Sequence, residues 1–179
     1  MMAEIRAPNS VMLIIAVSSR YPAALQWAQQ IATSEFGELA ERSVAFPFDQ
    51  TDYYEQSMGP DLKKQFLAFE TLIDPGRLRA IKHLTNQWEL DYAQQADHVE
   101  SRPLNLDPGY ISEAKLVLAS TKDHAHRIYL DEGIYAEVTL HYQAGGWQKL
   151  PWTYPDYQQA DFQDFFLTCR KALRAAKRR

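Results

Sequence analysis

The pattern of apolar and polar residues predicts a β-α-β arrangement at the start of the chain. Residues 11–17 form an unbroken apolar run, which is typical of a buried strand. Pro22 suits the first position of a helix that continues to Phe36, and Gly37 suits its end. A second strand is expected near residues 38–48. Two strands joined through a helix are usually parallel, so the pattern favours a parallel arrangement here.

Two helical segments are expected in the middle of the chain. The first is predicted over about residues 60–71, after a polar and aromatic loop. The second begins at Asp74 and Pro75, an N-cap residue followed by a residue suited to the first helical position, and runs to about Gln94. A polar linker at about residues 96–102 follows and is the best candidate for an internal boundary. The apolar face of the second helix would consist of Leu78, Ile81, Thr85, Trp88 and Tyr92.

The second half of the chain predicts an antiparallel sheet. Strands are expected at residues 116–120, 125–130 and 134–142. The last two form a hairpin over residues 125–142, because a three-residue loop ending in Gly133 joins them. Within this hairpin Leu130 would face Ile134, Tyr129 would face Tyr135, Ile128 would face Ala136 and Arg127 would face Glu137.

A helix is expected to close the chain. A tight turn at residues 145–146 and a short strand at 147–150 come before it. Asp156 and Gln159 have the spacing of a capping box that would open it. The predicted fold class is therefore α+β, with a β-α-β opening, central helices, an antiparallel C-terminal sheet and a closing helix. The apolar face of this helix would consist of Phe162, Phe165, Cys169, Leu173 and Ala176.

Length and charge modify this picture at the two ends of the chain. A chain of 179 residues suits a single domain over residues 1–179, with a loose arm at 1–10 and a basic tail at 174–179. The last ten residues hold six of the 19 basic residues. Outside them 13 basic residues stand against 23 acidic ones, a balance of −10, which disfavours broad nucleic-acid binding. The tail can touch RNA, a membrane surface or the acidic body, or it can be a solvated helix end.

The single cysteine and the short apolar run bear on the compartment. Cys169 has no second cysteine with which to form an internal disulfide, and this fits a reducing compartment. The run at residues 11–17 is too short to span a bilayer, and the residues after it make a poor signal-peptide cleavage site. A cytoplasmic protein without a membrane partner is expected, and the oligomeric state is left open.

The densest group of chemically capable side chains lies between residues 105 and 130. Asp107 belongs to an Asp-Pro-Gly sequence, which is most simply a turn, although a role as metal ligand or base is an alternative. Lys122, Asp123, His126 and Arg127 follow on a short segment. No phosphate-binding loop, dinucleotide motif, serine-hydrolase motif or paired-cysteine motif is present in the sequence.

Arg127 and Glu137 have two interpretations in the predicted hairpin. In the structural one they form a cross-strand ion pair, which contributes about 0–1 kcal/mol when exposed. In the functional one the planar guanidinium of Arg127 binds a phosphate or carboxylate while Glu137 holds it in place, and Lys122 strengthens the site. Strand alternation would turn His124 and His126 to the opposite face. Two such histidines can bind a metal, but no third ligand has diagnostic spacing, so no metal site is assigned.

Several longer strings resemble a bacterial family known only as a domain of unknown function, DUF 4416. They are TDYYEQSMG at 51–59, FETLIDP at 69–75, IKHLTNQWE at 81–89, NLDPGY at 105–110, LVLASTKDHAHRIYL at 116–130, GIYAEVTLHY at 133–142 and PWTYPDY at 151–157. The family brings no established activity. The resemblance implies that the polar residues of these strings are family hallmarks: Asp52, Tyr54, Lys82, Asn86, Glu89, Asp107, Tyr110, Lys122, Asp123, His126, Arg127, Glu137 and Asp156.

Two functional hypotheses follow. In the first, the protein binds a small ligand bearing phosphate or carboxylate and can act on it, with no cofactor indicated. Arg127 and Lys122 would bind the anion, and His126 would serve as acid or base. The carboxylates that would orient or ligate are Asp107, Asp123 and Glu137, and the further ligand contacts would be Lys82, Asn86, Glu89, Asp52, Tyr54 and Tyr110.

In the second hypothesis the protein is a non-enzymatic module that contacts protein or RNA through its aromatic clusters and basic tail. The first hypothesis requires residues 51–54, 82–89 and 122–127 to meet in one concave pocket. Scattering of these groups over a convex surface would favour the second.

Overall fold

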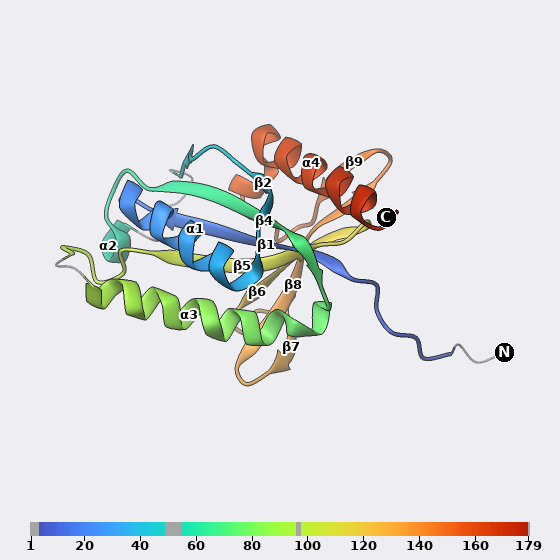
Figure 1. The fold of residues 1–179 in the computed structure, drawn as a ribbon, viewed down its shortest axis with the longest axis horizontal. Coiled ribbons are helices and arrows are strands. Elements are labelled where there is room, and N and C mark those ends of the chain that lie inside the picture. The colour runs from blue at the N-terminus through green and yellow to red at the C-terminus, as the bar shows by residue number, and fades with distance from the viewer. Residues whose placement is uncertain (1–3, 49–54, 96–97, 179) are drawn as a thin grey trace.

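A large antiparallel sheet organises the structure, a computed structural model that describes residues 4–48, 55–95 and 98–178 (Figure 1). The strands are paired in the order β2-β4-β1-β5-β6-β8-β7, with β3 beside β4 and β9 beside β8. The strands are β1 Val11–Ser19, β2 Leu39–Arg42, β3 Phe46–Pro47, β4 Lys63–Ile73, β5 Asn105–Ile111, β6 Lys115–Ser120, β7 Ile128–Asp131, β8 Ile134–Gln143 and β9 Gly146–Lys149. The helices are α1 Pro22–Phe36, α2 Glu55–Met58, α3 Leu78–Gln95 and α4 Ala160–Ala176, with 3-10 turns η2 Pro75–Arg77 and η3 Asp156–Gln158.

The opening β-α-β unit is split. β1 and β2 both pair antiparallel with β4, so they run in the same direction, as expected, but β4 lies between them. β4 and β5 are likewise joined through α3 and both pair with β1. The first part of the fold therefore consists of two interlocked split β-α-β units, and the fold class is α+β.

The prediction of a helix over residues 60–71 was wrong. Residues 63–73 form β4, an internal strand of the sheet. Phe66, Leu67, Ala68 and Phe69 are all buried, because helices cover both faces of the sheet. Burial on both faces removes the polar-apolar alternation that identifies a half-exposed strand.

The Asp107-Pro108-Gly109 sequence is also not a turn, but part of β5. Proline has no N–H to donate to a neighbouring strand. Pro108 is tolerated because β5 pairs with β6 only from Gly109 onward, so at Pro108 the strand has a partner on its β1 side and none on its β6 side. Gly109 permits the close contact with β6, since a Cβ at this position would lie 2.2 Å from the carbonyl oxygen of Val117.

The C-terminal hairpin forms with a shorter loop than expected. Asp131 faces Ile134, so the prediction that Leu130 does so was wrong. Glu132 and Gly133 form the turn, both with positive φ, as a two-residue hairpin loop requires. The predicted facing of Tyr129 with Tyr135 and of Ile128 with Ala136 is confirmed, because a register shift follows Tyr129.

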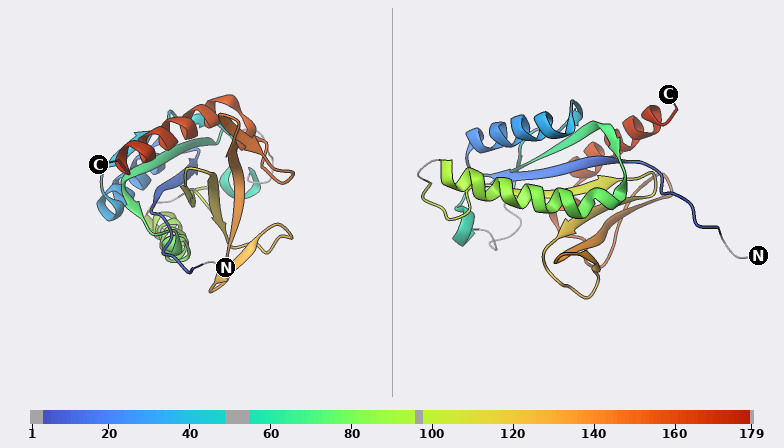
Figure 2. Two further views of the ribbon diagram at one scale, coloured as in Figure 1. Left: turned by 90° about the vertical axis from the view of Figure 1, so that its right-hand side faces the viewer. Right: turned by 60° about the horizontal axis from the view of Figure 1, so that its bottom comes forward.

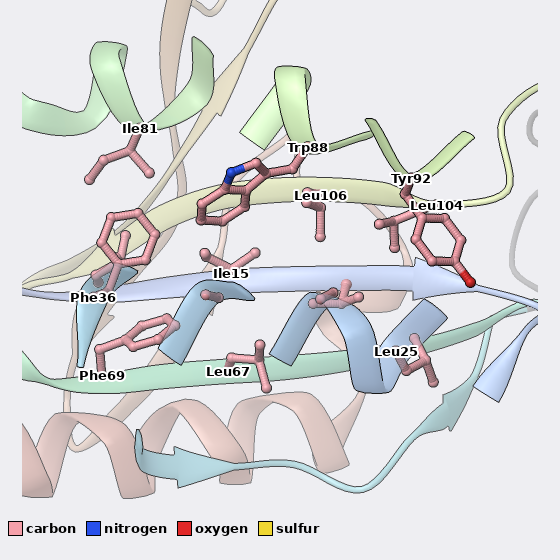
Figure 3. Packing of buried hydrophobic residues seen from close by; sticks show 14 of the residues in the cluster. Ile15, Leu25, Phe36, Leu67, Phe69, Ile81, Trp88, Tyr92, Leu104 and Leu106 are labelled. Carbon is pink, nitrogen blue, oxygen red and sulfur yellow. The ribbon is translucent and has the colours of Figure 1, made fainter. Parts of the chain in front are cut away.

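The hydrophobic core lies in layers on the two faces of the sheet. Figure 2 shows the sheet and its helices from two further directions. α1 and α3 cover one face, where Phe36 and Trp88 pack against Ile15 and Leu106 (Figure 3). The expected helical face of α3 is buried throughout. Across the described ranges 4–48, 55–95 and 98–178, no helix combines the length and apolarity needed to cross a membrane.

α4 covers the other face of the sheet. Phe162, Phe166, Cys169 and Leu173 are buried against it. Burial raises the pKa of the Cys169 thiol, as suits an inert core residue. The predicted capping box was wrong, because α4 begins at Ala160 and its N-cap residue makes no side-chain capping bond.

Candidate functional site

A cavity of about 690 Å³ forms where β5 and β6 separate. The two strands are paired only over Gly109–Ile111 and Leu116–Leu118. Beyond this short ladder, side chains of α3 reach the space between the strands and meet side chains from the α4 face. The cavity is lined by Phe48, Lys64, Lys82, Asn86, Arg102, Asn105, Asp107, Leu118, Ala119, Ser120, Thr121, Lys122, His124, Arg127, Glu137, Tyr154, Pro155, Asp156 and Tyr157.

Lys82 and Asp107 face each other in the lining of this cavity. The Lys82 ammonium donates to the carbonyl of Leu106 at 2.8 Å and to Oδ1 of Asp107 at 3.2 Å. The side-chain amide of Asn105 donates to Oδ2 of Asp107 at 2.7 Å. Burial alone would raise the pKa of Asp107, but Lys82, Asn105, Lys64 and Arg102 together lower it. Asp107 is therefore an ionised acceptor that opens onto the cavity.

Glu89 anchors α3 to the start of β5. Its carboxylate accepts from Nη2 of Arg102 at 2.9 Å and from the backbone N–H of Leu106 at 2.7 Å. Burial raises the pKa of Glu89, although Arg102 and Lys82 oppose this shift. Glu89 is not among the described lining residues, so its place is behind Arg102 rather than in the cavity wall.

Lys64 lies in the same cavity but comes from the opposite face of the sheet to Lys82. Its ammonium pairs with Oδ2 of Asp156 at 2.5 Å and lies 3.7 Å from the centre of the Phe48 ring. Lys64 and Asp156 are both buried. Sequence reasoning missed Lys64 because its segment was assigned to a helix. It interpreted Asp156 as a helix cap, whereas the carboxylate is the partner of a buried lysine.

Arg127 and Glu137 form a buried pair in the lining of the cavity. Nε of Arg127 donates to Oε2 of Glu137 at 2.7 Å, and the side chains are only 3% and 2% exposed. Nη1 of Arg127 donates to Ser120 Oγ at 2.6 Å and to the Lys122 carbonyl at 3.0 Å. Nη2 donates to the Tyr154 hydroxyl at 3.0 Å. The predicted pairing is confirmed, and its burial distinguishes it from an exposed surface ion pair.

His126 lies on the same side as Arg127, so the prediction that it points the other way was wrong. Residues 124–127 form a turn rather than a strand, with the backbone N–H of Arg127 donating to the carbonyl of His124. Nε2 of His126 is 3.1 Å from Oε2 of Glu137, and its ring stacks on Trp152 at 5.2 Å. His126 therefore supports Glu137 from outside the described cavity lining.

A comparison with family models identifies the family of this chain. The model described as Domain of unknown function (DUF4416) matches residues 9–173. The chain belongs to this family. No curated protein and no solved structure matches the DUF4416 chain.

The other predicted site residues of the DUF4416 chain are divided between several places. Asp52 and Tyr54 lie outside the described residues. Tyr110 packs on the α3 side of the sheet. Asp123 is near Tyr135, and burial, aided by that carboxylate, raises the pKa of the tyrosine. Of the predicted ligand contacts, Lys82, Asn86, Lys122 and Arg127 line one cavity, together with Asp107 and Glu137.

The charges around the cavity are uneven. Among the described lining residues, five cationic side chains stand against three carboxylates, a formal excess of two positive charges in a chain of net charge −4. Within ranges 4–48, 55–95 and 98–178 there is no group of three or more His, Cys, Asp or Glu side chains suited to hold a metal. The lining therefore offers cationic and hydrogen-bonding contacts to a ligand.

Proposed function

We propose that the cavity between β5 and β6 binds a small ligand that carries a phosphate or carboxylate group. The main support is the excess of cationic side chains around a cavity of about 690 Å³ in an acidic protein. This volume lies in the range of small-molecule sites. Several cations also hold fixed positions, since Lys64, Lys82 and Arg127 are each oriented by a carboxylate.

Lys82 as well as Arg127 has a hydrogen-bond donor available for a ligand. Arg127 already uses four of its N–H groups, because Nε and Nη2 each make one bond and Nη1 makes two. The Lys82 ammonium makes two bonds and has a third donor left. We confine the function to binding, because His126, the predicted acid or base, lies outside the described lining.

Asn86 allows a direct test. It lines the cavity from α3, and its amide makes no hydrogen bond with another residue of the described ranges, so Asn86→Asp adds a negative charge without removing a contact there. Gln94→Glu adds the same charge on the exposed surface of the same helix and is the matched control. A thermal-shift screen of sugar phosphates, nucleotides and carboxylates on the wild type selects a ligand, and calorimetry then gives its affinity for each variant.

We expect Asn86→Asp to weaken binding of the selected anion about tenfold or more, and Gln94→Glu to leave it unchanged. Equal binding by wild type and both variants would contradict a site in this cavity. A screen in which no phosphate or carboxylate stabilises the wild type would contradict the function itself.

A second candidate, an interaction module, has one observation in its favour. β7 is an edge strand, and Ile128, Tyr129 and Leu130 are exposed along it.

The basic tail gives less support to RNA contact, since Arg174 and Lys177 each lie 3.6 Å from the carboxylate of Glu113. Removing residues 174–179 should leave RNA affinity and its salt dependence unchanged; a decrease in both would favour the RNA-binding module.

A further inference from the structure

Tyr154 is an exposed aromatic side chain in the lining of the cavity. It is 45% exposed, whereas Phe48 and Tyr157, which line the same cavity, are 7% and 3% exposed. The rings of those two residues already have partners, since the Lys64 ammonium lies 3.7 Å from the centre of Phe48 and Tyr157 stacks on Phe166 at 5.8 Å. In the described part of the chain, the Tyr154 ring contacts no other ring and no cation. Its face is therefore available to a ligand.

The Tyr154 ring is held in a fixed position. Its hydroxyl accepts a hydrogen bond from Nη2 of Arg127 at 3.0 Å. Thr153, the residue before it, donates through Oγ1 to the carbonyl of Thr139 in β8 at 2.6 Å. Pro155, the residue after it, has a fixed φ and also lines the cavity. A side chain that is already oriented loses little conformational freedom when a ligand packs against it, so Tyr154 is suited to binding.

Cationic groups lie beside this ring. In the described contacts Arg127 donates once through Nε and twice through Nη1, so its remaining N–H is on Nη2, the nitrogen that contacts Tyr154. Lys122 is exposed and lines the same cavity. A flat ring on Tyr154 would thus lie beside a guanidinium, and an anionic group attached to that ring would be near two cations. An aromatic ring gains from stacking and from the cation, whereas a saturated ring has no π-face for either.

We infer that the ligand is an aromatic anion, a flat ring bearing a phosphate or carboxylate, whose ring stacks on Tyr154 and whose anionic group lies toward Arg127 and Lys122. This ligand class rests on the proposed function, since it specifies which anion the cavity takes. Tyr154 is the residue that determines specificity, because it distinguishes flat rings from saturated ones that carry the same charge.

The test compares matched ligands by calorimetry. Benzoate is paired with cyclohexanecarboxylate, and phenyl phosphate with cyclohexyl phosphate, so that each pair shares its anionic group and its six-carbon ring. The saturated ring is at least as hydrophobic as the aromatic one, so a preference for the aromatic member reports stacking rather than burial of apolar surface. The quantity measured is the ratio of the two dissociation constants in each pair.

Three variants isolate the ring of Tyr154. Tyr154→Leu removes the ring, whereas Tyr154→Phe keeps the ring and removes only the hydroxyl that contacts Arg127. Any effect of the lost hydroxyl on the anion site should change both members of a pair alike and leave their ratio unchanged. Tyr129→Leu, at an exposed tyrosine of β7 outside the described lining, is the matched control.

We expect the wild type to bind the aromatic member of at least one pair about two- to tenfold more tightly than the saturated member. Tyr154→Leu should abolish this preference, and Tyr154→Phe and Tyr129→Leu should keep it. The ligand class is wrong if no member of either pair binds, if the wild type shows no aromatic preference, if Tyr154→Leu retains it or if Tyr154→Phe loses it. The anion site still stands in each of these cases when the screen on the wild type finds another phosphate or carboxylate whose binding Asn86→Asp weakens. If the screen finds none, the proposed function fails as well.

Discussion

Glu137 holds three side chains at once, and this determines how a substitution there acts. Its carboxylate accepts from Arg127 at 2.7 Å, lies 3.1 Å from Nε2 of His126 and accepts from Thr139 Oγ1 at 3.1 Å. The carboxylate and the guanidinium are both buried. A charge that loses its partner in such a place is left uncompensated, which costs more than the net contribution of the intact pair.

Removal of the Arg127 guanidinium should therefore destabilise the protein strongly. We expect Arg127→Met to lower the free energy of unfolding by about 3–5 kcal/mol, and the double variant Arg127→Met/Glu137→Met to recover at least half of that loss. Urea denaturation measures both. Arg42→Met, at an exposed residue bonded to Gln29, is the control and should change stability by less than about 0.5 kcal/mol. A double variant less stable than the single one would show that the pair itself stabilises the fold.

Asp107 makes stability depend on pH in a definite direction. Burial would raise its pKa, but the surrounding cations and Asn105 lower it below the ordinary value of 3.8. The unfolded chain then binds the proton at a higher pH than the folded chain, so the ionised carboxylate stabilises the fold above 3.8 and this contribution is lost as pH falls through the folded pKa. We expect the free energy of unfolding to fall less steeply for Asp107→Asn than for wild type below about pH 4. Parallel curves from urea titrations at each pH would contradict this.

The Arg127–Glu137 pair was predictable from the sequence, even though the loop length was not. Counting back from a three-residue loop puts Arg127 opposite Glu137. The true loop has two residues, but the register shift between Tyr129 and Asp131 restores the expected alignment of Tyr129 with Tyr135. The same counting misplaced His126, because it assumed that strand geometry continues through the turn at residues 124–127.

Among the elements, β5 shows how one glycine sets the spacing between β5 and β6 beside the cavity. A Cβ on Gly109 would lie 2.2 Å from the Val117 carbonyl oxygen, so β5 and β6 would have to move apart. We expect Gly109→Ala to destabilise the protein by about 1–3 kcal/mol and to weaken ligand binding, because the walls of the cavity shift. Gly146→Ala is the control, since its nearest atom would be 3.8 Å away. Thermal unfolding that is equal for both variants would contradict the close contact.

The elements that escaped sequence reasoning share a physical cause. β4 and β5 are internal strands covered on both faces, so neither shows the alternation of a half-exposed strand. Predicting a helix at β4 removed Lys64 from consideration, and predicting a turn at β5 left Asn105 without a role. By contrast, α1, α3 and β1 were predicted well, since helical periodicity, Pro22, Gly37 and the long apolar run are local signals.

For the whole molecule, the class of fold could be predicted but the strand order could not. Local patterns show that β1, α1 and β2 follow one another, yet nothing local specifies that β4 inserts between the two strands. The cavity depends on this long-range pairing. It brings Lys64 of β4 and Asn105 of β5 to either side of Ser18 on β1.

Because α3 and β6 both contribute residues to the cavity wall, ligand binding should stabilise both elements locally. We expect a saturating anion to slow amide hydrogen exchange in both α3 and β6 and to leave the exposed side of α1 unchanged, since only the first two line the cavity. Exchange measured with and without ligand tests this. Protection confined to the exposed tail near residue 174 would indicate binding elsewhere.

The pairing of Lys64 with Asp156 also has a consequence for synthesis of the protein. The two residues are separated by 92 positions, and the hydrogen bond from Ser19 to Pro103 spans 84. A nascent chain that has not yet extended beyond residue 156 has no carboxylate from η3 to offer to Lys64. The ammonium must then stay in water or be buried without its partner, so the central strands cannot close fully over it. The cavity between β5 and β6 is thus among the last parts of this protein to become complete on the ribosome.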